Sequence, residues 1–203
     1  MQRRRELMAM QSKLPSVYRR VEYLESDNAS WIETDIISPI EIVIDETLAI
    51  LVYADQYGCG YIGNGYSFAG FGQYAKYWQY NYSGSYKYGW STKIVLGQKY
   101  ETKLILKNGE QQFYVDGELG GTWDKTNTKT GSGGKVYIFR ANGSALFKAV
   151  RIYYIKFSTI DESEVLGEFI PCVRKSDSKP GMYDTVSKTF YTNAGTGEFI
   201  VPA

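Results

Sequence analysis

Alternating aromatic residues mark the stretch from Trp78 to Trp90, which reads WQYNYSGSYKYGW. On both sides of Gly84 every second residue is tyrosine or tryptophan, and a period of two is that of a β-strand. Because these side chains join a large apolar ring to a polar tip, a sheet face made of them suits both the flat faces and the hydroxyl groups of a sugar. The chemistry that this stretch predicts is ligand recognition by ring stacking.

A hairpin centred on Gly84 would bring the aromatic residues together. If Ser83-Gly84-Ser85 is a three-residue loop, the opposed residues form aromatic pairs on one face of the hairpin. The predicted pairs are Tyr82 with Tyr86, Tyr80 with Tyr88, and Trp78 with Trp90. Such pairs commonly stabilise a sheet, so the face could be one wall of the core. The high tyrosine content keeps an open binding face as the alternative, because every buried hydroxyl would need a hydrogen-bond partner.

The open-face interpretation gives a set of candidate ligand-binding residues. These are Trp78, Tyr80, Tyr88 and Trp90, with Tyr57 and Tyr61 at the rim from the neighbouring glycine-rich stretch. The opposite face of the hairpin carries Gln79, Asn81 and Lys87, which would be available only if that face were the open one.

The reactive residues of many hydrolases are missing. The chain has no histidine, which removes Ser-His-Asp and Cys-His nucleophiles and zinc sites of the HExxH type. Cys59 and Cys172 are the only cysteines, too few for a four-cysteine metal site or a disulfide scaffold. They either form a single bridge or remain two buried thiols. We therefore expect no catalytic residues, no metal, no cofactor and no enzymatic activity.

Charge and hydropathy exclude some partners. The chain has 23 Lys+Arg and 22 Asp+Glu, so no global field attracts nucleic acid or an anionic membrane. No apolar run approaches the length of a membrane span, and the N-terminal MQRRRELMAMQSK lacks the apolar segment of a secretory signal. We expect a protein made in the cytoplasm, with neither nucleic acid nor membrane as a partner.

The pattern of turns indicates an all-β protein. Among 203 residues there are 21 glycines, which separate short runs of tyrosine-rich and β-branched sequence. The clearest signal is KYETKLILKNGEQQFYVDGELGG, where Asn108-Gly109 and Asp116-Gly117 separate three strands, since both dipeptides favour two-residue hairpin turns. Undivided all-β domains commonly reach this size, so residues 14–203 are predicted to form one domain.

Residues 1–13 form a short N-terminal arm before that domain. The arm is too short for a stable isolated helix, and a frayed terminus is one interpretation. The other is a docking segment in which arginines pair with carboxylates and Leu and Met act as adaptable apolar anchors. The candidate assembly contacts are Arg3, Arg4, Arg5, Leu7 and Met8.

Three segments together resemble the concanavalin A-like, laminin-G-like jelly-roll modules found in bacteriophage structural proteins. They are LPSVYRRVEYLESDNASWIETDI, LILKNGEQQFYVDGEL and the C-terminal stretch from Val150 to Phe199. The last is the most specific, because FIPCVRKSD, GMYDTV and FYTNAGTG follow in the order and at about the spacing of that family. The resemblance implies a two-sheet antiparallel sandwich and a carbohydrate-binding or virion-surface role.

On this resemblance we expect a non-catalytic virion surface protein. It would recognise bacterial or mucosal glycans through its aromatic residues, attach to other virion proteins through the arm, and form a homo-oligomer in some arrangements. A structural decoration or fibre protein without glycan binding is the alternative. A glycoside hydrolase is a third hypothesis, but the ExDxxE motif of laminarinase-type relatives is absent, since Glu33-Thr34-Asp35 is followed by Ile36-Ile37-Ser38.

Overall fold

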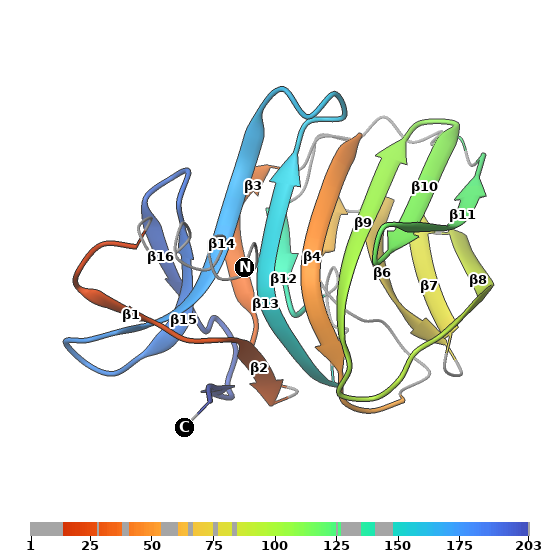
Figure 1. Ribbon diagram of the computed structural model, residues 1–203. Helices are drawn as coiled ribbons and strands as arrows, with labels where there is room; N and C mark the ends of the chain where they lie inside the picture. The colour runs from red at the N-terminus through yellow and green to blue at the C-terminus, as the bar shows by residue number, and fades with distance from the viewer. Residues whose placement is uncertain are drawn as a thin grey trace, which may run out of the picture.

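Two antiparallel sheets pack face to face in the computed structural model of the chain (Figure 1). The structure describes residues 14–27, 29–37, 41–53, 61–64, 67–74, 77–82, 85–124, 126, 135–140 and 148–202. Within these ranges the side chains of 61–77, 79–92 and 148–149 are not described. The described residues form strands and turns without a helix, which confirms the all-β prediction.

The larger sheet has eleven strands, and its central order is β11-β10-β9-β4-β13-β14-β15-β16. Strand β1 pairs with β14, and β2 pairs with both β13 and β17. The strands are β1 (Tyr18–Arg20), β2 (Leu24–Asp27), β4 (Ile42–Ile50), β9 (Lys99–Lys107), β10 (Glu110–Val115), β11 (Glu118–Trp123), β13 (Lys148–Ser158), β14 (Val165–Arg174), β15 (Pro180–Asp184), β16 (Thr189–Thr192) and β17 (Phe199–Ile200).

The smaller sheet has six strands in the order β3-β12-β5-β6-β7-β8 and lies behind the larger one in Figure 1. Its strands are β3 (Ile32–Ile37), β12 (Lys135–Ile138), β5 (Tyr61–Asn64), β6 (Ser67–Tyr74), β7 (Tyr77–Tyr82) and β8 (Ser85–Lys93). All of the strand pairs are antiparallel in both sheets, as the two-sheet sandwich prediction requires.

The meander β9-β10-β11 follows the turn signals of the sequence. Lys107 pairs with Glu110 around Asn108-Gly109, and Val115 pairs with Glu118 around Asp116-Gly117. Asp116 and Gly117 have φ of +50° and +83°, the positive values that two-residue hairpin turns of type I′ require. The prediction of two tight hairpins is confirmed.

The aromatic hairpin β7-β8 differs from its predicted register. Tyr82 pairs with Ser85, and Tyr80 pairs with Lys87. The pair that ends the hairpin is therefore Tyr82 with Ser85, where Tyr82 with Tyr86 was predicted, and each partner moves by one position. Because side chains alternate between faces, this shift breaks the predicted ladder of opposed aromatic pairs.

The core lies between the two sheets and is filled by alternate residues of each strand. On β4 the inward positions are Ile42, Ile44, Glu46, Leu48 and Ile50, all of which are buried. Cys172 on β14 is a buried free thiol, and burial raises its pKa to about 12. Cys59 and the arm residues 1–13 lie outside the described residues.

The C-terminal loop joins the edges of the two sheets. Edge strand β16 of the larger sheet lies beside edge strand β3 of the smaller one. After β16, the Asn193 Oδ1 atom accepts hydrogen bonds from the Trp31 N–H at 3.0 Å and the Gly195 N–H at 2.7 Å. The Ala194 N–H donates to the Trp31 carbonyl oxygen at 2.8 Å. Residues near opposite ends of the described chain thus close one side of the sandwich.

Candidate functional site

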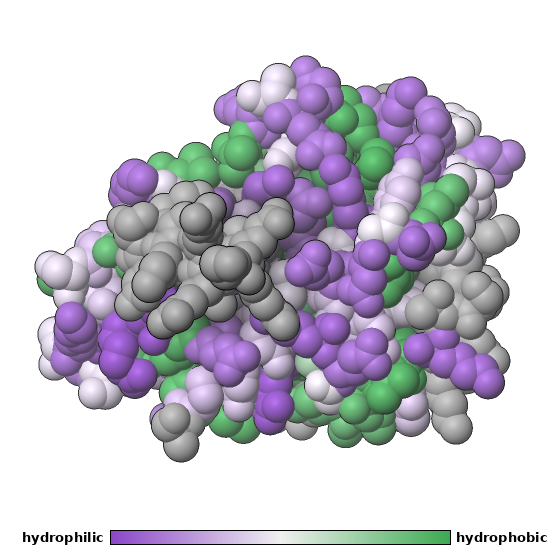
Figure 2. Space-filling view, viewed as in Figure 1, coloured by the Kyte–Doolittle hydropathy of each residue, from purple (hydrophilic) through white to green (hydrophobic). Residues whose placement is uncertain are grey.

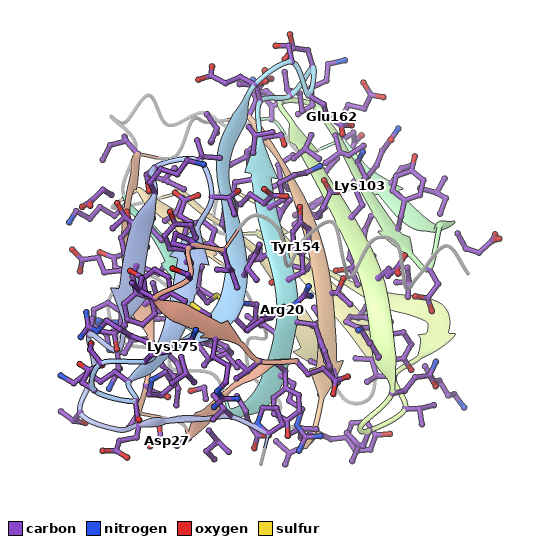
Figure 3. All side chains as sticks on the ribbon, turned by 60° about the vertical axis from the view of Figure 1, so that its left-hand side comes forward. Arg20, Asp27, Lys103, Tyr154, Glu162 and Lys175 are labelled. Atoms are coloured by element: carbon purple, nitrogen blue, oxygen red, sulfur yellow. The ribbon has the colours of Figure 1, made fainter. Side chains whose placement is uncertain are left out.

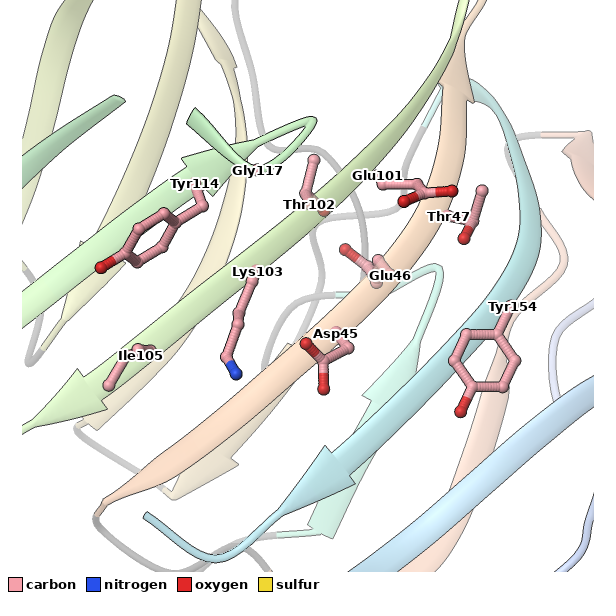
Figure 4. Close-up of a pocket in the computed structure, with 10 residues that line it drawn as sticks. All are labelled: Asp45, Glu46, Thr47, Glu101, Thr102, Lys103, Ile105, Tyr114, Gly117 and Tyr154. Carbon is pink, nitrogen blue, oxygen red and sulfur yellow. The ribbon is translucent and has the colours of Figure 1, made fainter. Parts of the chain in front are cut away.

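A groove of about 560 Å³ crosses the outer face of the larger sheet. It lies over strands β4, β9, β10 and β13, the face turned toward the viewer in Figure 1. Its lining residues are Asp45, Glu46, Thr47, Glu101, Thr102, Lys103, Ile105, Tyr114, Gly117 and Tyr154 (Figure 4). Figure 2 shows hydrophilic side chains over much of this face, with hydrophobic residues between them.

The register of the sheet explains which side chains meet in the groove. Directly opposed residues of antiparallel strands share a face. Tyr114 pairs with Lys103, and Lys103 pairs with Asp45, so these three form one row across the outer face. Glu101 pairs with Thr47, and Thr47 pairs with Tyr154, which gives a second row. The small Thr47 side chain at the centre leaves the hollow between its larger neighbours.

Two tyrosine rings border the groove on opposite sides. Tyr114 extends from β10 and Tyr154 from β13, with β9 and β4 between them (Figure 4). Three interstrand spacings of about 4.8 Å separate the two strands, or about 14 Å in all. This width exceeds that of a single sugar ring, so a ligand that touched both rings would be an oligomer.

Hydrogen bonds hold both tyrosine hydroxyl groups. The Tyr154 hydroxyl donates to Glu168 Oε1 at 3.1 Å, and the Tyr114 hydroxyl donates to Gln112 Oε1 at 2.9 Å. Burial, together with the Glu168 carboxylate, raises the pKa of the Tyr154 hydroxyl. Both rings are half-buried, so each is anchored while part of it remains accessible.

Lys103 and Asp45 at the groove form ion pairs. Lys103 Nζ lies 2.5 Å from Glu162 Oε1, on the loop between β13 and β14, as Figure 3 shows near one end of the sheet. Asp45 Oδ2 lies 2.8 Å from Lys156 Nζ, although the geometry is that of an ion pair and not of an aligned hydrogen bond. The Glu101 carboxylate is exposed and makes no ion pair or hydrogen bond with the part of the chain that the structure describes.

Glu46 is a buried carboxyl group on the strand that forms the groove floor. It is 3% exposed and lies on the core side of β4, opposite the inward-facing Thr102. No hydrogen-bond partner for either carboxyl oxygen lies among the described residues. Burial raises the pKa of Glu46 well above its ordinary value. Its side chain therefore lies behind the floor and is not part of the solvent-facing surface.

A cluster of rings and cations lies on β9, β13 and the segment that enters β2, beyond the Thr47 row. The Arg151 guanidinium lies 4.4 Å from the ring centre of Tyr23 and donates to Glu25 Oε2 at 2.7 Å. Lys99 Nζ lies 4.2 Å from the ring centre of Tyr153. These residues contact one another and do not line the groove.

The structure corrects the predicted role of Trp78. Its side chain is 0% exposed and contacts Tyr100, with ring centres 5.2 Å apart, and Phe113, with ring centres 5.9 Å apart. A ring in this position cannot stack on a ligand, because the larger sheet covers it. The core interpretation of the aromatic stretch is therefore correct for this residue.

The structure does not test the other predicted site residues. For Tyr61, Tyr80, Tyr88 and Trp90 the structure describes the strand positions but not the side chains, so their binding role stays a prediction. Tyr57 lies outside the described residues. The same holds for the assembly contacts predicted in the arm, namely Arg3, Arg4, Arg5, Leu7 and Met8.

The groove residues were missed because they are far apart in the sequence. Tyr114 lies in QQFYVDG and Tyr154 in RIYYIKF, and neither stretch has an aromatic residue at every second position as residues 78–90 do on both sides of Gly84. A signal was present in the alternation of β10, where Gln111, Phe113 and Val115 face inward and leave Tyr114 outside. The pairing of β4 with both β9 and β13, which brings the tyrosines to one face, is not readable from local patterns.

Comparison with known proteins identifies the fold. Neither a protein-family model nor a curated protein sequence matches the chain. A heptameric SAP-like pentraxin from Limulus polyphemus matches 89% of this chain and 94% of its own, with a TM-score of 0.57 and 10% identity. Domains LG4-5 of the mouse laminin α1 chain match 90% of this chain and 49% of theirs, with a TM-score of 0.53 and 10% identity. The fold is a concanavalin A-like jelly roll.

Some larger proteins match only part of this chain. A Trypanosoma rangeli sialidase in complex with sialic acid matches 58% of this chain at 17% identity, with a TM-score of 0.47, and the chain spans 20% of that protein. Its TM-score is too low to bear on the function. No helix long and apolar enough to cross a bilayer occurs among the described residues. Within the same residues, no three acidic or cysteine side chains are grouped so as to hold a metal ion.

Proposed function

We propose that this jelly roll is a non-catalytic carbohydrate-binding protein whose ligand lies in the groove on the larger sheet. The observation that carries the proposal is the placement of Tyr114 and Tyr154 on opposite borders of a groove of about 560 Å³, with polar side chains between them. Aromatic rings with polar tips supply apolar contact and hydrogen bonds together. Ligand sites in proteins commonly combine an apolar lining with a few placed polar groups.

The family resemblance of the sequence supports the same proposal, since it implies carbohydrate binding or a virion-surface role. The virion location, attachment through residues 1–13 and a homo-oligomeric state remain predictions that the described residues do not test. The alternative is a decoration protein without glycan binding. Only the result of the binding experiment distinguishes it from the proposed function.

The test is a glycan array followed by calorimetric titration of oligosaccharides that bind. Tyr114→Ala should weaken binding at least tenfold, whereas Tyr114→Phe, which keeps the ring, should weaken it by no more than a few fold. Tyr137→Ala is the matched control, because Tyr137 lies on β12 in the smaller sheet, packed edge-on against Trp31. Equal binding by the Tyr114→Ala and Tyr137→Ala variants would place the ligand elsewhere, and no binding to any glycan would favour the decoration role.

A glycoside hydrolase is the second candidate, because the groove holds the carboxyl groups of Asp45 and Glu101 on neighbouring strands. Asp45 is opposite Lys103, so Glu101 is its diagonal neighbour at roughly 7–8 Å. An inverting enzyme has its two carboxyl groups about 6.5–9.5 Å apart, and one must be protonated as the acid. Asp45 Oδ2 lies 2.8 Å from Lys156 Nζ, so this carboxyl group already contacts another side chain and is not free to approach a glycosidic oxygen. Release of reducing ends from a bound glycan, abolished in Glu101→Gln, would establish catalysis.

A further inference from the structure

The unpaired charge at the groove is negative. Lys103, the one cation of the lining, is paired with Glu162, and Asp45 is paired with Lys156. Glu46 is turned into the core. The Glu101 carboxylate remains, exposed within the groove and without an ion-pair partner among the residues described. We infer that the groove prefers glycans that carry protonated amino groups over neutral glycans, and disfavours acidic glycans. This inference rests on the proposed function.

Two hydrogen bonds fix the backbone at Glu101. The Glu101 N–H donates to Asp116 Oδ1 at 2.8 Å, and the Asp116 N–H donates to the Glu101 carbonyl oxygen at 2.7 Å. These bonds join β9 to the tight turn before β11 and bring a second carboxylate, that of Asp116, next to the same segment. Asp116 is exposed and makes no ion pair within the described part of the chain. Two anionic groups therefore lie at this end of the groove.

The other cations near Glu101 also have partners among the described residues. Lys99 is two residues from Glu101 on the same face of β9, and its ammonium group lies over the Tyr153 ring. Arg151, on the neighbouring β13, is paired with Glu25. Each of these cations already contacts another side chain. The amino group of a ligand would therefore interact with the Glu101 carboxylate.

The position of Glu101 fits a ligand that spans the two tyrosines. Figure 4 shows its carboxyl group over β4 beside Thr47, between the Tyr114 and Tyr154 borders. A sugar amino group at this point would gain a charge-assisted hydrogen bond, which is stronger than a bond between neutral groups. A sugar carboxylate at the same point would face Glu101 and Asp116 as a like charge.

The experiment compares three oligomers of equal length by calorimetric titration at pH 6. They are a glucosamine hexamer, an N-acetylglucosamine hexamer and a galacturonic acid hexamer, and the first two differ only in acetylation. We expect the glucosamine hexamer to bind about twofold to fivefold tighter than its acetylated form, the range that corresponds to one exposed ion pair. The galacturonic acid hexamer should bind weakest, and both the advantage of the glucosamine hexamer and the disadvantage of the galacturonic acid hexamer should shrink with added salt.

Variants assign the preference to one residue. Glu101→Gln should abolish the advantage of the glucosamine hexamer, and Glu101→Lys should shift the preference toward the galacturonic acid hexamer. Glu110→Gln is the control, because Glu110 is an exposed carboxylate on neighbouring β10, paired with Lys107 outside the groove lining. It should bind all three oligomers as the unmodified protein does.

The outcomes separate this inference from the proposed function. If N-acetylglucosamine or galacturonic acid oligomers bind as tightly as glucosamine oligomers, or if Glu101→Gln and Glu101→Lys leave the order unchanged, the charge preference is refuted and glycan binding stands. If no glycan binds in these titrations or on the array, the proposed function fails and this inference fails with it.

Discussion

Replacing Trp78 by alanine should destabilise the fold rather than remove a ligand contact. The side chain is fully buried against Tyr100 and Phe113, so its removal leaves a cavity between the two sheets. Truncation of a buried Trp or Phe to Ala typically lowers the free energy of unfolding by about 3–5 kcal/mol. Domains are commonly stable by only about 5–15 kcal/mol, so the variant loses a large share.

The loss in free energy of unfolding can be measured by urea unfolding monitored by circular dichroism, a signal that does not depend on the removed indole. With an m-value of about 2 kcal/mol/M, a loss of about 4 kcal/mol lowers the midpoint by about 2 M urea. Trp123→Ala on edge strand β11 is the control, because this ring is only partly buried, and we expect a loss of roughly 1–2 kcal/mol. A Trp78→Ala variant with an unchanged midpoint and no glycan binding would refute the core assignment and restore the ligand platform.

Three further predictions concern pH and packing. The pKa of Glu46 is raised by burial above 4.5, so the folded state binds the proton more tightly and stability falls as pH rises beyond that value. Glu46→Gln should therefore raise the urea midpoint at pH 7 and change it little at pH 4, and an equal effect at both values would contradict this. Hydrogen bonds from Arg174 lower the pKa of Asp177 to about 2, so its stabilising contribution is present above pH 3.8 and lost as pH falls through 2. In Arg174→Ala, an NMR titration should find the pKa of Asp177 higher, and no rise would exclude the guanidinium as the cause. A Cβ at Gly181 would lie 2.8 Å from Phe190 Cζ, so Gly181→Ala should lower the free energy of unfolding by about 1–3 kcal/mol in urea unfolding, a loss that would be absent if the β15-β16 hairpin can move aside.

Local patterns predicted the strands well where turn chemistry and alternation agree. Asn108-Gly109 and Asp116-Gly117 are two-residue signals whose backbone needs are specific, and the strands that flank them were found where expected. The hairpin at Gly84 lacks such a dipeptide, so the choice between a two-residue and a three-residue loop was open. That single residue decided which side chains oppose each other along β7 and β8.

The candidate site could not be predicted from local sequence patterns, for a different reason. A stretch dense in aromatic residues indicates β-propensity and burial as much as it indicates exposure, and the Trp78 side chain is buried. The groove instead needs β4 between β9 and β13, with Tyr114 and Tyr154 brought to one face from positions 40 residues apart in the numbering. The N-terminal segment that carries the family resemblance forms β1 to β3, but it contributes no residue to the groove lining.

The loop at Asn193 has a consequence for synthesis of the chain on the ribosome. Trp31 and the start of β3 emerge early, yet the groups that satisfy the Trp31 N–H and carbonyl belong to residues 193 and 194. Until those residues leave the exit tunnel, this margin of the nascent sandwich exposes unpaired backbone to neighbouring chains, a template for strand addition. Completion of this margin therefore waits for residues 193 and 194, and a stalled or prematurely terminated product that lacks them is the form most prone to aggregate.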